Sequence, residues 1–400
     1  MSKIKRAYRY RFYPTDEQRS ILARTFGCTR YVYNWALRLK KDTHQQTGKG
    51  LSYQQLSSAL TTLKEQKETS FLGEVSCVPL QQGLRHLTRA YLNFFEGRAS
   101  YPTFKKRHGE QSAEYTRSAF TWKDGTLTLA KMDAPLSIVW SRDLPKGATP
   151  STVTVSRDQA GRHFVSLLVE EEITPLPKMP NQIGIDLGLK TMVVTSDGQT
   201  FDNPRYFARD EKKLAKAHKR HARKKKGSKN REKARRKVAK IHARIGDRRR
   251  DYQHKLSTKL IRENQMICCE SLSVKNMMQH PCLSKAIADV GWGEFVRQLE
   301  YKAAWCGRTV IKIDRWYPSS KTCSVCGQVL DSLALECREW RCPACSTHHD
   351  RDINAATSVL VEGLRRSAVG PTVAACGGDV RANLHGTREA NRPRSRNQGE

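Results

Sequence analysis

The sequence lacks the features that would place a protein in a membrane or export it. It contains no long apolar run and no amphipathic anchor segment, so a membrane partner is not expected. Its first residues, MSKIKR, are not followed by the apolar core of a signal peptide. We therefore expect a protein of the cytoplasm.

Acidic residues are scarce relative to basic ones. The 400 residues include 72 Lys or Arg but only 39 Asp or Glu, which gives a formal net charge of +33. A surplus of that size indicates a polyanionic partner, and nucleic acid is the first candidate. The length is sufficient for about two or three domains with a sizeable core.

Cysteine is comparatively abundant, since twelve are present. In a reducing compartment, CxxC pairs bind metal rather than form disulfides. Cys323 and Cys326 form one such pair, Cys342 and Cys345 form another, and fifteen residues separate the two pairs. That spacing lets four thiolates close tetrahedrally on one structural Zn²⁺. We expect the other eight, including Cys337, to behave as small apolar residues.

The N-terminal part of the chain changes its pattern twice. Residues 3–13 alternate apolar and basic side chains, which is typical of a strand with one wet face. Residues 16–100 carry apolar faces at helical spacing. Short apolar runs separated by turn residues then predict a small barrel, with strands at 120–122, 126–129, 136–140, 151–155 and 163–169. If the first strand joins this barrel, the helical region is an insertion.

After a proline-rich linker at 175–180, alternating strands and helices predict an α/β domain. Within it, residues 205–250 contain 22 Lys or Arg and only 4 Asp or Glu. Such an imbalance does not allow intrahelical pairing, so it indicates an anionic partner rather than a solvated helix face. The last stretch, 367–400, is polar and rich in Gly, Arg and Asn, and we expect it to be mostly disordered.

Three carboxylates stand at the ends of predicted elements in the α/β domain. Asp186 interrupts an apolar strand, Glu270 ends another, and Asp352 precedes a helix. Alone, Asp186 fits the phosphate-binding hairpin of actin-like ATPases, Glu270 a surface acid, and Asp350 or Asp352 a helix cap. On neighbouring elements of one sheet, the three could instead hold two Mg²⁺ ions for phosphodiester hydrolysis. The order strand-Asp, strand-Glu, paired CxxC, Asp-helix is more specific than any single member.

These motifs carry a family resemblance over nearly the whole length. The chain resembles the TnpB (OrfB) family of insertion-sequence proteins, which is related to the type V CRISPR effectors. The matching segments are 10–14 (YRFYP), 27–35 (GCTRYVYNW), 80–82 (LQQ), 90–95 (AYLNFF), 101–106 (YPTFKK), 184–188 (GIDLG), 270–272 (ESL), 276–277 (NM), 291–295 (GWGEF), 317–323 (YPSSKTC) and 350–356 (DRDINAA).

The resemblance implies a multidomain α+β fold with boundaries that can be placed on this sequence. Residues 1–14 and 111–178 would form a wedge β-barrel domain, and 15–110 a helical recognition lobe. Residues 181–366 would form a RuvC-like RNase H α/β nuclease domain, with a zinc ribbon inserted at 320–347.

The resemblance also implies a function, which is RNA-guided DNA cleavage for a transposable element. The guide RNA would come from the transposon end, and double-stranded target DNA would be cut beside a short adjacent motif. Asp186, Glu270 and Asp352 match the family's three magnesium-binding acids. Asp352 is chosen over Asp350 because the third acid stands two residues before the Asn, here Asn354. A transposase encoded by the same element is a further expected partner.

Several residues are expected to contact nucleic acid. Tyr53, Ser57 and Gln81 fall where the family reads the adjacent motif. A basic loop containing an aromatic residue and the most basic part of the 205–250 segment supply further candidates. These are Phe104, Lys105, Lys106, Lys224, Lys225 and Lys226.

Other functions share parts of this pattern. An RNA-guided DNA-binding repressor that does not cut would be marked by a replaced acid, and all three acids are present. A transposase or accessory transposition protein could use the same metal chemistry, but no tyrosine-nucleophile HUH arrangement is found. An actin-like ATPase would need a duplicated half, and no such repeat is found. The repressor and the accessory transposition protein remain the alternatives to the nuclease.

Overall fold

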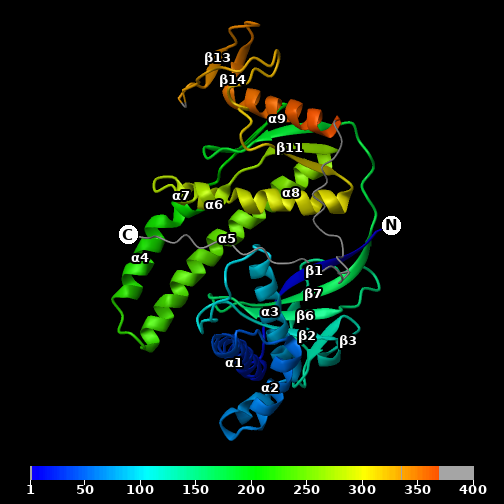
Figure 1. Cartoon of the computed structure of the whole chain (residues 1–400), viewed down its shortest axis with the longest axis vertical. Coiled ribbons are helices and arrows are strands. Elements are labelled where there is room, and N and C mark those ends of the chain that lie inside the picture. The colour runs from blue at the N-terminus through cyan, green and yellow to red at the C-terminus, as the bar shows by residue number, and fades with distance from the viewer. Residues whose placement is uncertain (1, 335, 369–400) are drawn as a thin grey trace, which may run out of the picture.

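The computed structural model describes residues 2–334 and 336–368 of the chain. Figure 1 shows tiers along the long axis, with a small ribbon at one end, then an α/β layer, an antiparallel sheet, and a helical lobe at the other end. The tail predicted at 367–400 lies outside the described residues, apart from 367 and 368, which end a helix.

The antiparallel sheet unites the chain's first strand with strands that follow the helical lobe. Its order is β2-β6-β7-β1-β5. Strand β1 pairs with β7 over eleven residues, from Ser2 opposite Ile173 to Phe12 opposite His163. The strands of this unit, including the separate hairpin β3–β4, are β1 (Ser2–Phe12), β2 (Gln111–Thr116), β3 (Phe120–Lys123), β4 (Thr126–Leu129), β5 (Ile138–Val139), β6 (Thr152–Arg157) and β7 (His163–Ile173).

The expected barrel is not closed by hydrogen bonds. Among the described strands, β2 and β5 are the two edges of the sheet and do not pair with each other. The β3–β4 hairpin instead contributes Leu127 and Leu129 to the same core as Tyr10 and Tyr115. Strand β2 was not predicted, because its sequence QSAEYT has no apolar run; its buried positions alternate Gln, Ala and Tyr.

The helical lobe is inserted between β1 and β2. Two of its helices begin with reciprocal caps, in which Thr15 and Ser52 exchange hydrogen bonds with Gln18 and Gln55. Leucines from all segments of the lobe form its core. The segments are α1 (Asp16–Thr47), α2 (Tyr53–Glu65), the 3-10 helix η1 (Lys67–Glu74) and α3 (Cys77–Phe95).

The α/β layer is a five-stranded sheet of order β10-β9-β8-β11-β12. Strands β8, β11 and β12 run parallel, and β9 and β10 return antiparallel at one edge. The strands are β8 (Gln182–Asp186), β9 (Thr191–Thr195), β10 (Thr200–Asp202), β11 (Met266–Glu270) and β12 (Thr309–Ile313). The helices are α4 (Tyr206–Ala222), α5 (Lys229–Glu263), α6 (Val274–Met277), α7 (Ser284–Val290), α8 (Trp292–Cys306) and α9 (Arg351–Ala368).

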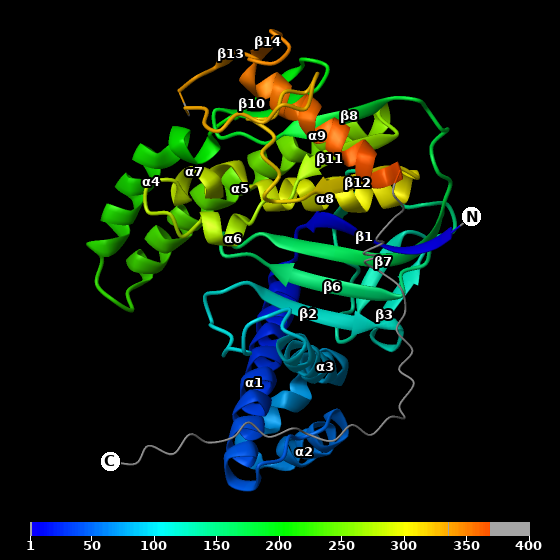
Figure 2. The same ribbon diagram turned by 45° about the horizontal axis from the view of Figure 1, so that its top comes forward.

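Helix α9 lies over the sheet (Figure 2), and two glycines allow the helix and the strands to approach closely. A Cβ added at Gly184 of β8 would come within 2.0 Å of the Ala356 carbonyl oxygen. A Cβ added at Gly363 of α9 would come within 2.3 Å of the Cys268 sulfur on β11. These contacts fix how α9 lies along β8 and β11.

Substitution of Gly184 by Ala is therefore expected to destabilise the α/β layer. The added methyl meets backbone, which cannot rotate away, so we expect a loss of about 3 kcal/mol or more in the free energy of unfolding. Gly246→Ala is the control, because nothing lies within 4 Å of its added Cβ and it is inside α5. It should stabilise by up to about 1 kcal/mol. Urea denaturation measures the free energy of unfolding of both variants. Equal changes in Gly184→Ala and Gly246→Ala would contradict the close packing of α9 on β8.

The chain between β12 and α9 forms the small ribbon, whose two strands are β13 (Glu339–Arg341) and β14 (His348–Asp350). Elsewhere, Arg162 of the antiparallel-sheet unit forms an ion pair with Asp247 of α5 and so ties that unit to the α/β layer. No helix in the described residues is both long and apolar enough to cross a lipid bilayer.

Candidate functional site

The parallel strands bring two of the predicted acids to one edge of the sheet. Asp186 is the last residue of β8 and Glu270 the last of β11. These strands are direct neighbours, with Ile185 opposite Cys269. Because parallel strands end on the same side, both carboxylates are at the same edge.

The third acid, Asp352, comes from the first turn of α9. Burial, together with the nearby carboxylates of Glu270 and Asp352, raises the pKa of Asp186 to about 7. The three acids thus interact electrostatically, although they lie more widely spaced than the four cysteines, whose sulfurs all lie within 4.8 Å of one another.

The structure distinguishes the roles of Asp350 and Asp352. The Asp350 carboxylate accepts the backbone N–H groups of Asp352 and Ile353, at 3.0 and 2.9 Å, and therefore caps α9. The Asp352 carboxylate is close enough to raise the pKa of Asp186, and it also lies 3.5 Å from the Arg338 guanidinium of the ribbon. This difference favours Asp352 as the third acid.

Ser319 is a positioning residue that sequence analysis missed. Its hydroxyl donates a 2.6 Å hydrogen bond to Glu270 Oε1, and its side chain is buried. Ser319 is in the matched segment YPSSKTC, but 49 residues separate it from Glu270, so only the fold shows the pairing. The bond fixes one Glu270 oxygen and leaves the other available to a cation.

The four predicted zinc ligands converge at the base of the ribbon. Cys323 Sγ lies 3.6 Å from Cys345 Sγ, and Cys326 Sγ lies 3.6 Å from Cys342 Sγ. Four sulfurs at tetrahedral Zn–S distance are about 3.8 Å apart, so the cluster has the dimensions that Zn²⁺ needs.

Polar groups beside two of the four cysteines would stabilise their thiolates. His349 Nε2 lies 3.1 Å from Cys323 Sγ, and a hydrogen bond from Thr347 lowers the pKa of Cys345 to about 6. Such partners stabilise thiolates around a metal. Cys337 directs its sulfur to the Glu339 carbonyl oxygen, at 3.0 Å, and is outside the cluster.

The ribbon is docked on α9 through Asn354. Its amide donates to the Thr322 carbonyl oxygen at 2.8 Å and accepts from the Ser324 N–H at 3.0 Å. Asn354 is buried and lies within one turn of Asp352. The first zinc knuckle and the third acid are therefore held by one helix.

The residues predicted to read DNA lie together on the helical lobe. Tyr53 and Ser57 are one turn apart on α2, and Gln81 is exposed on α3. The guanidinium of Arg85, one turn after Gln81, lies 4.7 Å from the Tyr53 ring centre and joins the two helices. Arg85 is a further candidate contact, whose spatial relation to Tyr53 the sequence did not show.

The predicted basic loop packs against α1. The backbone of Lys105 exchanges two hydrogen bonds with the Asn34 amide, and its ammonium lies 4.2 Å from the Tyr33 ring centre. These contacts give Lys105 a packing role, and burial lowers its pKa. Lys106 follows it, and Phe104 is about half exposed and lines a cavity of about 650 Å³ that also contains Arg30 and Trp35 of α1.

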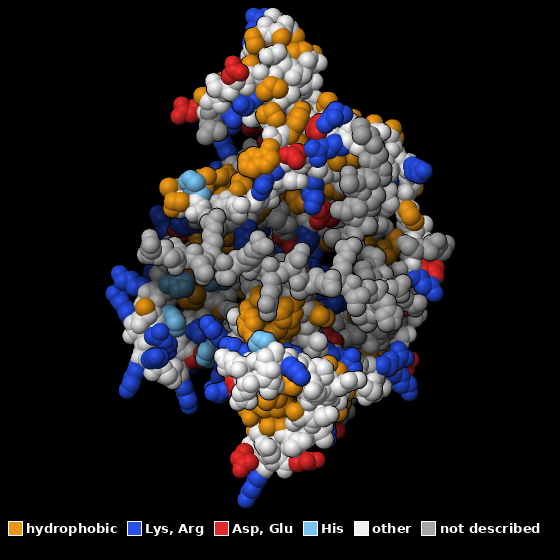
Figure 3. Space-filling model, in the orientation of Figure 1, with side chains coloured by type: hydrophobic (Ala, Val, Ile, Leu, Met, Phe, Trp, Pro, Cys, Tyr) orange, Lys and Arg blue, Asp and Glu red, His pale blue; other side chains and the backbone are white. Residues whose placement is uncertain are grey.

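The basic segment forms a hairpin of two helices, α4 and α5, with Lys224, Lys225 and Lys226 exposed in the turn. Its four acids are all ion-paired, to Arg248, Lys285, Arg235 and Arg162 among others. Most of its cations therefore have no acid within the segment. Lys and Arg side chains gather over this hairpin, at the lower left of Figure 3.

Three family models match the chain. One described as "Probable transposase" matches residues 164–280, one described as "Cas12f1-like, TNB domain" matches 292–359, and one described as "Helix-turn-helix domain" matches 1–49. The last range holds strand β1 and the single long helix α1 in this structure.

Curated relatives cover almost the entire chain. A "Putative RNA-guided DNA endonuclease" of Streptomyces pristinaespiralis is 54% identical over 92% of each chain. "Putative RNA-guided DNA endonuclease InsQ" of Escherichia coli is 31% identical over 93% of this chain and 94% of its own length.

Two solved structures share the fold. A Cas12f1–sgRNA–target DNA complex gives a TM-score of 0.53 at 15% identity, over 89% of this chain and 98% of the other. The structure of the mini-RNA-guided endonuclease CRISPR-Cas_phi3 gives a TM-score of 0.50 at 8% identity, over 90% of this chain and 92% of the other. The chain therefore has the mixed α/β, multidomain fold of these compact effectors.

Proposed function

The chain belongs to the TnpB (OrfB) family of RNA-guided endonucleases of insertion sequences, and from this we propose that it cuts DNA at a RuvC-like site formed by Asp186, Glu270 and Asp352. The proposal includes a guide RNA from the transposon end and a target marked by a short adjacent motif. The observation that carries it is that Asp186 and Glu270 end neighbouring parallel strands, while Asp352 of α9 is close enough to raise the pKa of Asp186.

The donor set fits Mg²⁺. Carboxylate oxygens are the ligands that Mg²⁺ prefers, and a cation would offset the burial and the neighbouring carboxylates that raise the pKa of Asp186. Mg²⁺ held there would supply an activated water and charge stabilisation at the scissile phosphate. The protein's part is to orient the acids: Ser319 fixes Glu270, and the cap by Asp350 fixes the first turn of α9.

We infer that the four cysteines bind one structural Zn²⁺. With four protein ligands no coordination position is open, so this metal would hold shape and take no part in cleavage. Its function would be to keep the ribbon docked on α9 and thereby to support Asp352.

The test of the proposed function is a cleavage assay with the full chain and its co-purified RNA. The substrate is a plasmid library in which a sequence complementary to the guide is flanked by randomised bases. Mg²⁺-dependent cuts beside one short motif are expected. RNA-dependent binding without cuts would favour a repressor, and RNA-independent strand transfer would favour a transposition protein.

We expect the α4–α5 turn to contact a nucleic-acid backbone. Neutralising Lys224, Lys225 and Lys226 together should reduce the salt dependence of RNA affinity by up to roughly three units in log–log slope, because each phosphate contact releases counterions. Filter binding between low and moderate salt measures the slope. Neutralising Lys123, Lys131 and Lys146 is the charge-matched control, and an identical effect of the two triple variants would contradict a specific role for the turn.

We expect Gln81 to read a base edge in the adjacent motif. Gln pairs bidentately with adenine, so Gln81→Ala should relax the preference at one or two motif positions by roughly tenfold or more, with guide matching still required. The randomised-flank library measures this directly. Gln54→Ala, a substitution of a neighbouring exposed glutamine on α2, should leave the motif unchanged. A uniform loss of cutting over all flanks for Gln81→Ala would contradict base reading.

A further inference from the structure

Trp316 is the most exposed of the large hydrophobic side chains in the described residues, at 79%. It follows β12 on the loop that leads to the zinc ribbon. Because β12 is the parallel neighbour of β11, with Ile313 opposite Glu270, this loop begins at the same sheet edge as the catalytic candidates. An exposed indole at this position contributes little to the core and needs another explanation.

The loop holds Trp316 in place from both sides. The backbone N–H of Trp316 donates to the Asp314 carboxylate at 2.8 Å, and the next residue, Tyr317, packs against the cluster that contains Ile313 and Val359. Two residues further on, Ser319 donates to Glu270. The backbone is therefore anchored at three points while the indole faces solvent.

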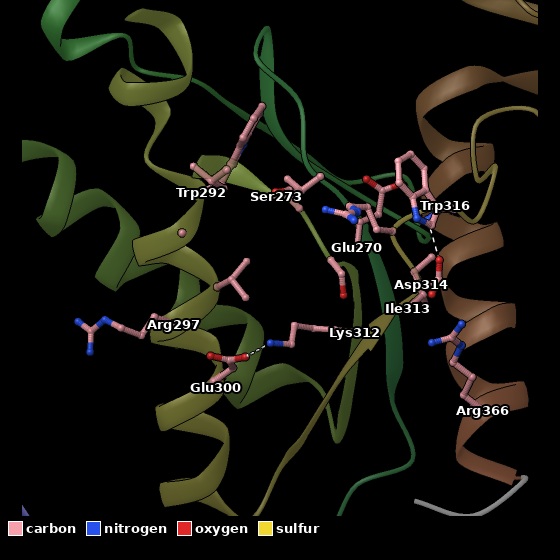
Figure 4. Close-up of a pocket in the computed structure, with 16 residues that line it drawn as sticks. Glu270, Ser273, Trp292, Arg297, Glu300, Lys312, Ile313, Asp314, Trp316 and Arg366 are labelled. Carbon is pink, nitrogen blue, oxygen red and sulfur yellow. Dashed lines mark hydrogen bonds and ion pairs between the residues drawn. The ribbon is translucent and has the colours of Figure 1, made fainter. Parts of the chain in front are cut away.

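Trp316 and Glu270 line the same cavity, whose volume is about 610 Å³. Figure 4 shows Trp316 and Asp314 on the α9 side of this cavity, Arg297 and Glu300 on the α8 side, and Glu270 between them. The cavity thus connects an aromatic surface with a candidate catalytic acid.

The cavity is lined by charges of both signs. Its cations are Arg297, Lys312, Arg315 and Arg366, and its acids are Glu270, Glu300 and Asp314. Three of the cations form ion pairs, with Glu294, Glu300 and Glu362. The guanidinium of Arg315 lies 4.8 Å from the Trp316 ring centre, and it forms no ion pair with any carboxylate of residues 2–334 and 336–368. An aromatic face beside a guanidinium that forms no ion pair is a combination that binds a base and its phosphate.

We propose that Trp316 is a stacking platform for one unpaired nucleotide next to the scissile phosphate, with Arg315 contacting that nucleotide's backbone. The inference rests on the proposed function, because it takes Glu270 to be at the cutting site. A base that stacks on an indole must leave its duplex neighbours, so the ligand is single-stranded DNA. Trp316 is then a positioning residue that holds the strand against the acids.

The cleavage test combines one protein change with one DNA change. The full chain with its co-purified RNA cuts a matched target, and the cut position is mapped. Nucleotides on either side of it are then made abasic, one at a time. At the stacked position, loss of the base should slow wild-type cutting by roughly tenfold or more. Trp316→Ala should slow cutting of intact DNA by a similar factor and show no further loss on the abasic DNA.

Trp316→Phe is the matched variant, since it keeps an aromatic face, and it should retain most of the wild-type rate and its sensitivity to the abasic site. If the abasic site slows Trp316→Ala as much as it slows wild type, the two losses of rate multiply. That result would show that the substitution acts by loosening the loop near Glu270, and would overturn stacking. An unchanged rate in Trp316→Ala would overturn it as well.

A binding measurement separates this proposal from the proposed function. Single-stranded DNA containing 2-aminopurine is titrated with the full chain in magnesium-free buffer. Stacking on Trp316 should quench the fluorescence for wild type and Trp316→Phe but not for Trp316→Ala. If wild type cuts no DNA, the proposed function fails, while this difference in quenching still supports the stacking site. Equal quenching in all three proteins overturns the stacking site, whatever the cleavage result.

Discussion

Replacing Asp186, Glu270 or Asp352 by its amide is expected to abolish DNA cutting by the RNA-loaded protein. Each acid is proposed to hold a cation whose charge stabilisation amounts to several kcal/mol, so the rate should fall by roughly 10³-fold or more. RNA affinity should stay near that of wild type, because a carboxylate contributes nothing to phosphate binding. Single-turnover cleavage and filter binding measure the two quantities.

Asp350→Asn is the control for the third acid. An amide oxygen can still cap α9, so this variant should keep most of its activity. If Asp350→Asn were inactive and Asp352→Asn active, the assignment of the third acid would be reversed.

The metal-free protein offers an independent measurement on Asp186. Its pKa is raised to about 7, above an unfolded value of roughly 3.9. The folded state therefore binds a proton at Asp186 more tightly than the unfolded state does. The resulting gain in folding free energy is fully present below about pH 4 and is lost as the pH rises through about 7. Asp186→Asn removes the cost of the buried charge. In magnesium-free buffer it should melt above wild type at about pH 8, and the difference should shrink towards about pH 5.

Loss of the zinc is expected to have the second large effect. Purified protein should contain about one zinc per chain, and Cys342→Ser should contain almost none, because structural sites contribute on the order of 10 kcal/mol of folding free energy. We expect the ribbon of Cys342→Ser to unfold. Cutting should also fall, because Asn354 joins the first knuckle to the helix that carries Asp352.

Cys337→Ser provides the matched control, since Cys337 lies in the same ribbon but directs its sulfur to a backbone carbonyl. It should keep both the zinc and the activity. Metal analysis and cleavage assays compare the zinc content and the cutting rate of Cys342→Ser with those of Cys337→Ser. A folded, active wild-type sample without zinc would contradict the structural site.

The arrangement as a whole suits a division of labour between protein and RNA. The helical lobe offers a small polar surface around Gln81 and Tyr53, which is enough for a few base pairs in a groove. The basic helical hairpin offers positive charge, and its few acids are held in ion pairs. Long target specificity would then come from base pairing with the guide, and the protein would recognise the backbone.

The sequence by itself determined the parts that depend on local spacing. The two CxxC pairs indicated four sulfurs around one metal, and those sulfurs are gathered within 4.8 Å of one another. The apolar runs that end in Asp186 and Glu270 indicated strands, and both residues end strands. The positive charge of 205–250 indicated an anionic partner, which stays a prediction. Each of these signals is carried by residues close together in the chain, where geometry follows from periodicity and ligand chemistry.

Tertiary structure alone decided the contacts between distant segments. The pairing of Ser319 with Glu270, of Arg85 with Tyr53, and of Asn354 with the first zinc knuckle joins residues that are 30 to 49 positions apart. Strand β2 was also decided in this way, because its polar sequence becomes a strand through pairing with β6. The position of Trp316 beside Glu270 depends on the parallel register of β11 and β12. No local pattern encodes these placements, because they arise only when separate elements pack and pair across the chain.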